Sequence, residues 1–415
     1  MSPMSPSGTS LERRAALAAL VHAEMAGLPV QHHDAATGHP LCVVGFGPEE
    51  VVAATEVMLT TEVTMGARVR AFEAVWAARC GKRHGVMVNS GSSANLLLLA
   101  ALVEAGHLAP GDEVLVPAVG WSTTLFPVAQ VGLVPVLVDV DPATLCLDPA
   151  SAAAARTPRT RAVFAVHLLG QAAAMAPYDD LLVLEDACGA HGATIGGRPV
   201  GGIGLGATFS FFFSHHITTM EGGIVVTDDD VLADTMRSLR AHGWVRERSD
   251  RAALEAASPE IDPRFLFVSS GYNLRPTEVA AAFGLVQERR LDAWVAQRRA
   301  NHVDWCARVG VIPGVTVFPE APGTTHAGFA FPMLVAGDRA GCMAALEARG
   351  IATRPVSGSN LARQPAFARV AARTPVPLPV SDAVHTRGFF VGNSHAFGPD
   401  HGARLAAALT SWSSS

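Results

Sequence analysis

The residue types best suited to proton transfer lie in the segment 208–223, where two adjacent histidines, His215 and His216, precede a pair of glycines. An imidazole titrates near neutral pH, so a histidine can take up a proton and return it. A covalent imine requires an amine instead, and the chain has a single lysine, Lys82, well upstream. The segment therefore predicts proton chemistry without a covalent anchor. A histidine pair seen in isolation is more often an incidental part of a loop or core.

A second candidate is a turn of small residues that contains Gly91, Ser92 and Ser93. It lies between an apolar run at 86–88, which predicts a strand, and an apolar helical run at 96–103. Backbone N–H groups at the start of a helix bind anions, and the helix dipole favours this. The turn therefore predicts a phosphate site, although ordinary helix N-capping explains the same residues.

Two further residues follow predicted strands. Asp186 comes just after the apolar run 181–184, and Trp121 follows the run 114–116. A carboxylate at a strand end can hold a cationic ring nitrogen or cap a helix. An indole can stack on a planar ligand or fill the core. Both alternatives stay open at each position when the residues are considered alone.

The frame around His215 resembles the segment that carries the Schiff-base lysine in fold-type-I sugar aminotransferases, which depend on pyridoxal 5'-phosphate (PLP). In that family a serine stands five residues before the lysine and Glu-Gly-Gly follows it. Here these are Ser210 and 221–223, and the lysine position holds His215. With this replacement the chain resembles the nucleotide-sugar 3-dehydratases of the DegT-like superfamily, above all those acting on GDP-4-keto-6-deoxymannose in colitose biosynthesis. The resemblance extends from about residue 47 to about residue 392.

This resemblance implies a cofactor and its ligands. The resting cofactor is expected to be pyridoxamine 5'-phosphate (PMP), bound non-covalently, because an imidazole cannot form the imine. His215 is the expected acid and base in removal of the 3-hydroxyl of a nucleotide-linked 4-keto-6-deoxy sugar. The expected cofactor ligands are, for the phosphate, Gly91, Ser92, Ser93 and Ser210; for the pyridine nitrogen, Asp186; and for the ring face, Trp121.

The resemblance also implies partners. Members of the family are homodimers with shared active sites, so Asn273 is expected to reach the neighbouring subunit's site, although it could also cap a helix near Pro276. An amino donor such as L-glutamate is expected to recharge the cofactor. The guanidinium groups of Arg246 and Arg248 could bind the diphosphate of the substrate or belong to an ordinary charged loop. The candidate substrate contacts are His216, Arg246, Arg248 and Arg275.

One position departs from the family pattern. Gly189 stands where the aminotransferases have glutamine and the colitose-type enzymes have glutamate. A missing side chain beside the cofactor leaves room for a different sugar or a different way of recharging the cofactor. The sequence therefore does not specify the nucleotide or the sugar stereochemistry.

Short apolar runs alternate with helical segments from Gly85 onward. This pattern predicts an α/β fold with a mostly parallel sheet covered on both faces and chemistry at the carboxyl ends of the strands. The family resemblance implies the aspartate aminotransferase-like fold, with a seven-stranded sheet in a large domain and a smaller C-terminal α/β domain. The expected divisions are an N-terminal helix and arm at 1–47, a large cofactor-binding domain at 48–275, and a linking helix, 276–309, with the small domain at 276–415.

Composition excludes several classes of protein. With 415 residues, 49% of them hydrophobic, and a formal net charge of −6, the chain has no basic surplus to neutralise a nucleic acid. Its six cysteines include no Cys-x-x-Cys pair, so we expect neither a metal site nor an iron–sulfur cluster. No apolar stretch is long enough to cross a bilayer, and His22 and Glu24 interrupt the only run that resembles an export signal. The expected location is the cytoplasm.

Three rival classes explain part of the pattern. A PLP-dependent aminotransferase-like enzyme acting on another keto substrate would need the lysine that is missing. A catalytically silent protein of the same fold could bind a ligand or partner, but the joint presence of phosphate, ring and stacking positions argues against such decay. A dinucleotide-dependent enzyme would need Gly-x-Gly-x-x-Gly after the first strand, and the sequence lacks it.

Overall fold

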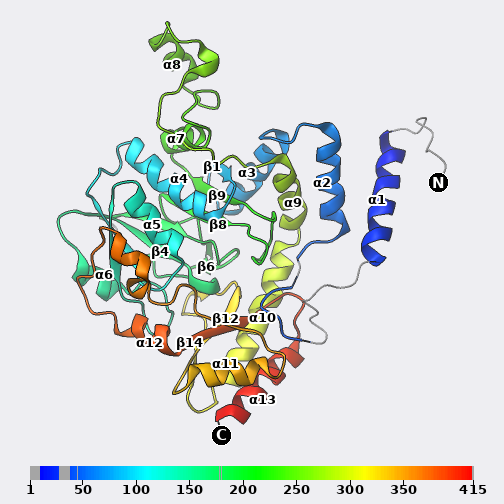
Figure 1. Cartoon of the computed structure of the whole chain (residues 1–415), viewed down its shortest axis with the longest axis vertical. Coiled ribbons are helices and arrows are strands. Elements are labelled where there is room, and N and C mark those ends of the chain that lie inside the picture. The colour runs from blue at the N-terminus through cyan, green and yellow to red at the C-terminus, as the bar shows by residue number, and fades with distance from the viewer. Residues whose placement is uncertain (1–9, 28–37, 44, 177, 179, 414–415) are drawn as a thin grey trace.

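The computed structural model describes residues 10–27, 38–43, 45–176, 178 and 180–413. The extreme N-terminus and much of the predicted arm at 29–47 lie outside these residues. Figure 1 shows a large unit built around a central sheet and, below it, a smaller unit that contains the C-terminus.

The central sheet has seven strands in the order β1-β9-β8-β5-β4-β2-β3. Strands β3, β2, β4, β5 and β8 pair in parallel, and only β9 runs antiparallel to its neighbours β1 and β8. This confirms the predicted α/β fold with a mostly parallel seven-stranded sheet. The strands are β1 (His84–Val88), β2 (Glu113–Pro117), β3 (Val134–Val138), β4 (Thr160–Val166), β5 (Leu182–Asp186), β8 (Gly206–Ser210) and β9 (Gly223–Thr227).

Helices cover both faces of this sheet, which explains why its strands are continuous apolar runs. Successive side chains of β1 show the two faces: Val86 and Val88 lie in one core cluster and Met87 lies in the other. The first cluster is covered by α4 (Gly91–Glu104), α5 (Ser122–Gln130) and α7 (Asp230–Arg240). The second is covered chiefly by α3 (Ala67–Arg79) and α9 (Glu278–Glu288), and α6 (Pro149–Ala155) lies at the β3 edge.

The smaller unit is a four-stranded antiparallel sheet packed on helices, in the order β10-β12-β14-β13. Its core includes Trp305, Phe331, Phe389 and Leu405, all fully buried. Two of the strands, β10 and β14, were not predicted from the sequence. The elements are β10 (Val315–Val317), β12 (Ala330–Val335), β13 (Thr353–Pro355), β14 (Gly388–Gly392), α10 (Leu291–Val309), α11 (Arg339–Glu347), α12 (Pro379–Arg387) and α13 (Pro399–Ser413).

The predicted helix 276–309 is two helices, because the chain turns at Arg289 and Arg290 between α9 and α10. Helix α9 packs against α2 (Pro48–Thr60) and α3 and so belongs to the large unit. Further along the chain, Leu361 N–H bonds to the Ala118 carbonyl, and residues around Arg373 pair with β3. Helix α9, Leu361 and the residues around Arg373 therefore pack on the large unit.

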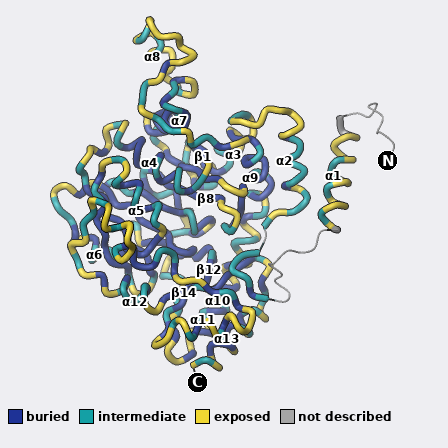
Figure 2. Tube along the Cα trace, viewed as in Figure 1, coloured by how far each residue is buried: buried dark blue, intermediate teal, exposed yellow. Residues whose placement is uncertain are grey.

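Two segments stand away from the rest of the fold. Helix α1 (Ser10–Gly27) lies beside α2, with Arg14 near Glu56, and the segment around α8 (Arg251–Ala257) projects beyond α7 (Figure 1). Figure 2 shows that both segments are largely exposed. Among the described residues, no helix combines the length and apolar character that a membrane span requires.

Candidate active site

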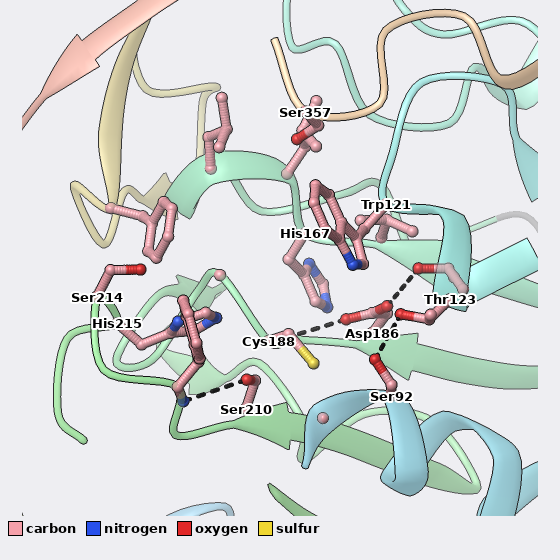
Figure 3. A pocket seen from close by; sticks show the side chains of 18 of the residues that line it. Ser92, Trp121, Thr123, His167, Asp186, Cys188, Ser210, Ser214, His215 and Ser357 are labelled. Carbon is pink, nitrogen blue, oxygen red and sulfur yellow. Dashed lines mark hydrogen bonds between the residues drawn. The ribbon is translucent and has the colours of Figure 1, made fainter. Parts of the chain in front are cut away.

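A cavity of about 510 Å³ lies where the carboxyl ends of β4, β5 and β8 meet the start of α4. The small unit forms part of its wall through Phe329, Arg354 and Phe390. This is the edge at which the sequence predicted the chemistry. Of the predicted site residues, the cavity lining contains Gly91, Ser92, Trp121, Asp186, Ser210 and His215 (Figure 3).

The start of α4 forms one side of the cavity. The hydroxyl of Ser90 caps the helix by accepting the Ser93 N–H at 3.0 Å, so the predicted turn is in fact the first turn of the helix. A Cβ on Gly91 would lie 2.5 Å from the Ser210 Cβ, which means that only glycine lets α4 approach β8 this closely. Ser92 Oγ donates to Thr123 Oγ1 at 2.8 Å. The N–H groups of this turn have no carbonyl partner within the helix and suit an anion.

Ser93 lies just outside the lining. Its hydroxyl donates to Asn89 Oδ1 at 2.6 Å, which links the first turn of α4 to the residue before the N-cap. The side chain therefore supports the cap and does not face the cavity.

Asp186 ends β5 and is held by three donors. Its Oδ2 accepts from Thr124 Oγ1 at 2.6 Å and from Asn95 Nδ2 at 3.0 Å. Its Oδ1 accepts the Cys188 N–H at 3.1 Å. The side chain is 5% exposed and has no cationic partner among the described residues. A buried carboxylate without a countercharge favours a cationic ligand, as a protonated pyridine nitrogen would be.

Trp121 precedes α5 and is 60% exposed, so it is not a core tryptophan. Figure 3 shows its indole on the same side of the cavity as Asp186 and Thr123. A planar ligand that reached Asp186 could stack on this ring.

His215 lies on the loop after β8, and Figure 3 shows its imidazole directed into the cavity. The ring packs against Phe329 with centroids 5.1 Å apart, and its Nδ1 is buried with no hydrogen-bond partner among the described residues. Burial lowers the pKa of His215 to about 3, and the charge of Arg298 acts in the same direction. The imidazole is therefore neutral near pH 7 and able to accept a proton.

Lys82 cannot replace the missing amine. Its Nζ donates to the Gly204 carbonyl at 2.9 Å and to Asp228 at 3.1 Å, and the residue does not line the cavity. Among the described residues of one chain, no lysine therefore reaches this site.

The other predicted contacts lie outside this cavity. His216 is buried behind the wall, with Nε2 3.0 Å from the Ala327 carbonyl oxygen. Arg246 stacks on Trp244, and Arg248 pairs with Asp250. Asn273 is exposed and accepts a hydrogen bond from Arg275 at 3.0 Å.

Sequence reasoning missed several lining residues. Asn95 and Thr124 follow the predicted site residues Ser93 and Trp121 by two and three positions, so their roles could have been found there. Arg354, the only arginine or lysine of the described lining, carried no local signal. Gly189 also lines the cavity, and a Cβ there would be 3.6 Å from the nearest atom, which is ordinary van der Waals contact. No group of His, Cys, Asp and Glu within the described ranges is arranged to hold a metal ion.

The sheet order, the anion-binding helix start, the buried carboxylate and the histidine loop together define a PLP-dependent enzyme of the aspartate aminotransferase-like fold. Residues 46–410 match the model of the DegT/DnrJ/EryC1/StrS aminotransferase family. The chain belongs to this family.

Curated relatives include sugar 3-dehydratases. The chain is 36% identical over 374 residues to GDP-4-keto-6-deoxy-D-mannose 3-dehydratase of Yersinia pseudotuberculosis, which covers 85% of this chain and 93% of that protein. It is 37% identical over 368 residues to dTDP-4-dehydro-2,6-dideoxy-D-glucose 3-dehydratase of Saccharopolyspora spinosa, covering 83% of this chain and 80% of that protein.

Solved structures point to the same group. A variant of GDP-4-keto-6-deoxymannose-3-dehydratase with bound GDP-perosamine has a TM-score of 0.84 and 33% identity, covering 89% of this chain and all 100% of that one. The same enzyme with a trapped PLP-glutamate geminal diamine has a TM-score of 0.83 and 32% identity over the same shares.

Proposed function

We propose that this protein is a PMP-dependent dehydratase that removes the 3-hydroxyl of a nucleotide-linked 4-keto-6-deoxy sugar. One observation carries the proposal: the imidazole of His215 lines the cavity, within the sequence frame that resembles the lysine segment of the aminotransferases. The similarity to sugar 3-dehydratases over most of the chain supports the reaction class.

The residues present fit the cofactor. Gly91 and Ser92 at the start of α4, with Ser210, would hold the phosphate, and Ser93 would keep their turn closed. Asp186 would hold the protonated pyridine nitrogen, and Trp121 would cover one face of the ring. When bound, PMP supplies an amine that condenses with the substrate ketone and a cationic ring that accepts electrons.

His215 would move the proton. Its Nε2 is the nitrogen available to the cavity, since Nδ1 is buried. As a neutral base, Nε2 would remove a proton from the carbon that bears the cofactor amine, and the resulting imidazolium would return it to the departing 3-hydroxyl. An imidazole cannot capture the cofactor covalently, so the amine form stays available for dehydration.

The substrate and the amino donor are proposed from the relatives. A related enzyme was solved with GDP-perosamine and with a PLP-glutamate adduct, which supports a nucleotide sugar as substrate and L-glutamate as donor. Arg354 is the lining cation that could meet a carboxylate or a phosphate. The side of the cavity lined by Gly189 would decide which sugar substituents fit.

We further propose a homodimer with shared active sites, working in the cytoplasm. Asn273, Arg275, Arg246 and Arg248 lie outside this chain's cavity, and the segment around α8, which follows the last two of these in sequence, projects from the fold (Figure 1). That segment exposes Phe265 and Phe267, which are 60% and 50% exposed. Such a surface would bury its aromatic rings on a second copy and bring these polar groups to the neighbour's site.

The test is an incubation of the purified protein with PLP, L-glutamate and GDP-4-keto-6-deoxy-D-mannose, repeated with a dTDP-linked 4-keto sugar. We expect release of ammonia and loss of the 3-hydroxyl, measured by mass spectrometry of the sugar. Glutamate consumption with a new sugar amine would establish an aminotransferase instead. No turnover of any tested sugar would favour a silent binding protein.

A further inference from the structure

Two fully buried imidazoles, those of His191 and His216, lie behind the half-buried His215 that lines the cavity, and the proposed reaction uses only His215. His191, on the loop after β5, is 0% exposed and has no partner for either ring nitrogen among the described residues. Its ring centroid lies 6.1 Å from that of His215 and 5.1 Å from that of His216. The Nδ1 atoms of His215 and His216 are also buried and without a described partner. Four buried nitrogens of this cluster make no hydrogen bond of normal geometry among the described residues, although the Ser210 carbonyl acts on His191, and each carries a desolvation cost.

The hydrogen bond of His216 fixes one end of this cluster. Its Nε2 lies 3.0 Å from the carbonyl oxygen of Ala327, which can only accept. Nε2 must therefore carry the proton. In the neutral ring, Nδ1 of His216 is then a lone pair that can accept a hydrogen bond.

His191 sits between the other two rings and is held there by aromatic packing. Its ring makes an edge contact with Trp76 at 5.2 Å and a tilted contact with Phe211 at 5.5 Å. A neutral imidazole has one N–H and one lone pair. If the N–H of His191 is directed to His216 Nδ1 or to the Ser210 carbonyl, its lone pair is left for His215. No hydrogen bond joins these rings among the described residues, so a small ring rotation or one bridging water would be needed to connect them at these centroid separations.

We propose that His191 is a positioning residue that keeps the proton of His215 on Nδ1, so that Nε2 presents its lone pair to the cavity. The inference rests on the proposed role of His215 as a base. In this arrangement each ring donates to an acceptor, and the series ends at a backbone carbonyl. After His215 has accepted a proton on Nε2, its Nδ1–H still donates to His191, so the ring does not reorient between the two proton transfers.

The surroundings keep all three rings neutral. Burial lowers the pKa of His191 and of His216 well below the usual value, and Arg298 on α10 acts in the same direction on both. Arg79 on α3 also lowers the pKa of His191, while the Ser210 carbonyl opposes the lowering. The neighbouring imidazoles disfavour one another's charge. Neutral rings are the condition for a directional series of donors and acceptors.

The experiment uses holoenzyme labelled with ¹⁵N-histidine, in wild type and in His191→Phe, His191→Gln and His395→Phe. His395 is a matched control, because it is another histidine with a buried Nδ1 that has no described partner, and it is half-buried and stacked on Trp294 at 4.2 Å. Two-bond proton–nitrogen spectra report which nitrogen of His215 carries the proton. Steady-state kinetics report kcat, KM and their pH profiles.

In wild type and His395→Phe we expect His215 in the Nδ1–H form. In His191→Phe we expect a mixture of tautomers and a kcat about tenfold lower, the effect of one lost hydrogen bond, with KM nearly unchanged. His191→Gln retains an acceptor and should restore most of the loss. An unchanged His215 tautomer in His191→Phe, or equal loss of kcat in the Phe and Gln variants, would overturn the inference. Absence of dehydration in wild type would instead overturn the proposed function, whatever the tautomer.

Discussion

Replacing Gly91 with alanine tests whether the start of α4 holds the cofactor phosphate. The added Cβ would lie 2.5 Å from the Ser210 Cβ and 3.1 Å from the Cys188 Sγ. Non-bonded carbons pack at about 3.5–4.0 Å, so the helix start and β8 would have to separate by about 1 Å. Overpacking of this kind costs about 1–3 kcal/mol. If the displacement of the turn reduces the binding free energy of PMP by the same amount, PMP affinity falls by roughly 5- to 150-fold.

The assay is a PMP titration followed by the quenching of tryptophan fluorescence, together with thermal unfolding of the cofactor-free protein. Gly398→Ala is the matched control, because a Cβ there meets no atom within 4 Å and the backbone is not strained. We expect the control to change neither quantity. A Gly91→Ala protein that loses stability but binds PMP normally would refute the assignment of the phosphate to this turn.

Three further predictions concern the rest of the site. The Lys82→Ala variant should dehydrate the substrate at the wild-type rate, since Lys82 is held by Gly204 and Asp228 away from the site. Borohydride treatment of PLP-loaded wild type should add no cofactor mass to the protein, and a covalent adduct would contradict this. Asp186→Asn should weaken PMP binding by at least about tenfold, because the amide removes the negative charge and places a donating NH₂ group against donors that now bond to the carboxylate; unchanged affinity in the titration would contradict it. The free energy of unfolding should be highest above about pH 6.5 and fall as the pH drops toward about 4. Burial lowers the pKa of three histidines to about 4 in the folded state, so between these pH values the unfolded chain binds more protons than the folded one. A melting temperature that is flat between pH 7.5 and 5 would contradict this prediction. The three histidines are His39, His302 and His395.

The parts of the site that sequence reasoning found are those encoded locally. Gly91, Asp186 and His215 each lie within a short motif next to a strand, and the carboxyl ends of parallel strands meet at one edge. The sheet followed from the same signal, since strands buried on both faces are apolar throughout. Helix ends were less accurate: Gly91, Ser92 and Ser93, predicted as a turn, already belong to α4, because Ser90 caps the helix.

The residues that were missed come from tertiary packing. Phe329, Arg354 and Phe390 reach the cavity only because the small sheet docks there, and no local pattern encodes this. Conversely, Arg246 and Arg248 follow the site in sequence, but the chain turns outward after α7 and pairs them with Trp244 and Asp250. Position along the chain does not give the direction of a loop.

His215 is the residue proposed to move the proton in a site without a covalent anchor. The most direct measurement of this role compares His215→Asn with wild type in the dehydration assay, with PMP titration of both proteins. We predict a rate about 10² to 10⁴ lower, the usual worth of a positioned acid or base, with PMP affinity nearly unchanged. Dehydration by His215→Asn at the wild-type rate would show that His215 is not the group that moves the proton.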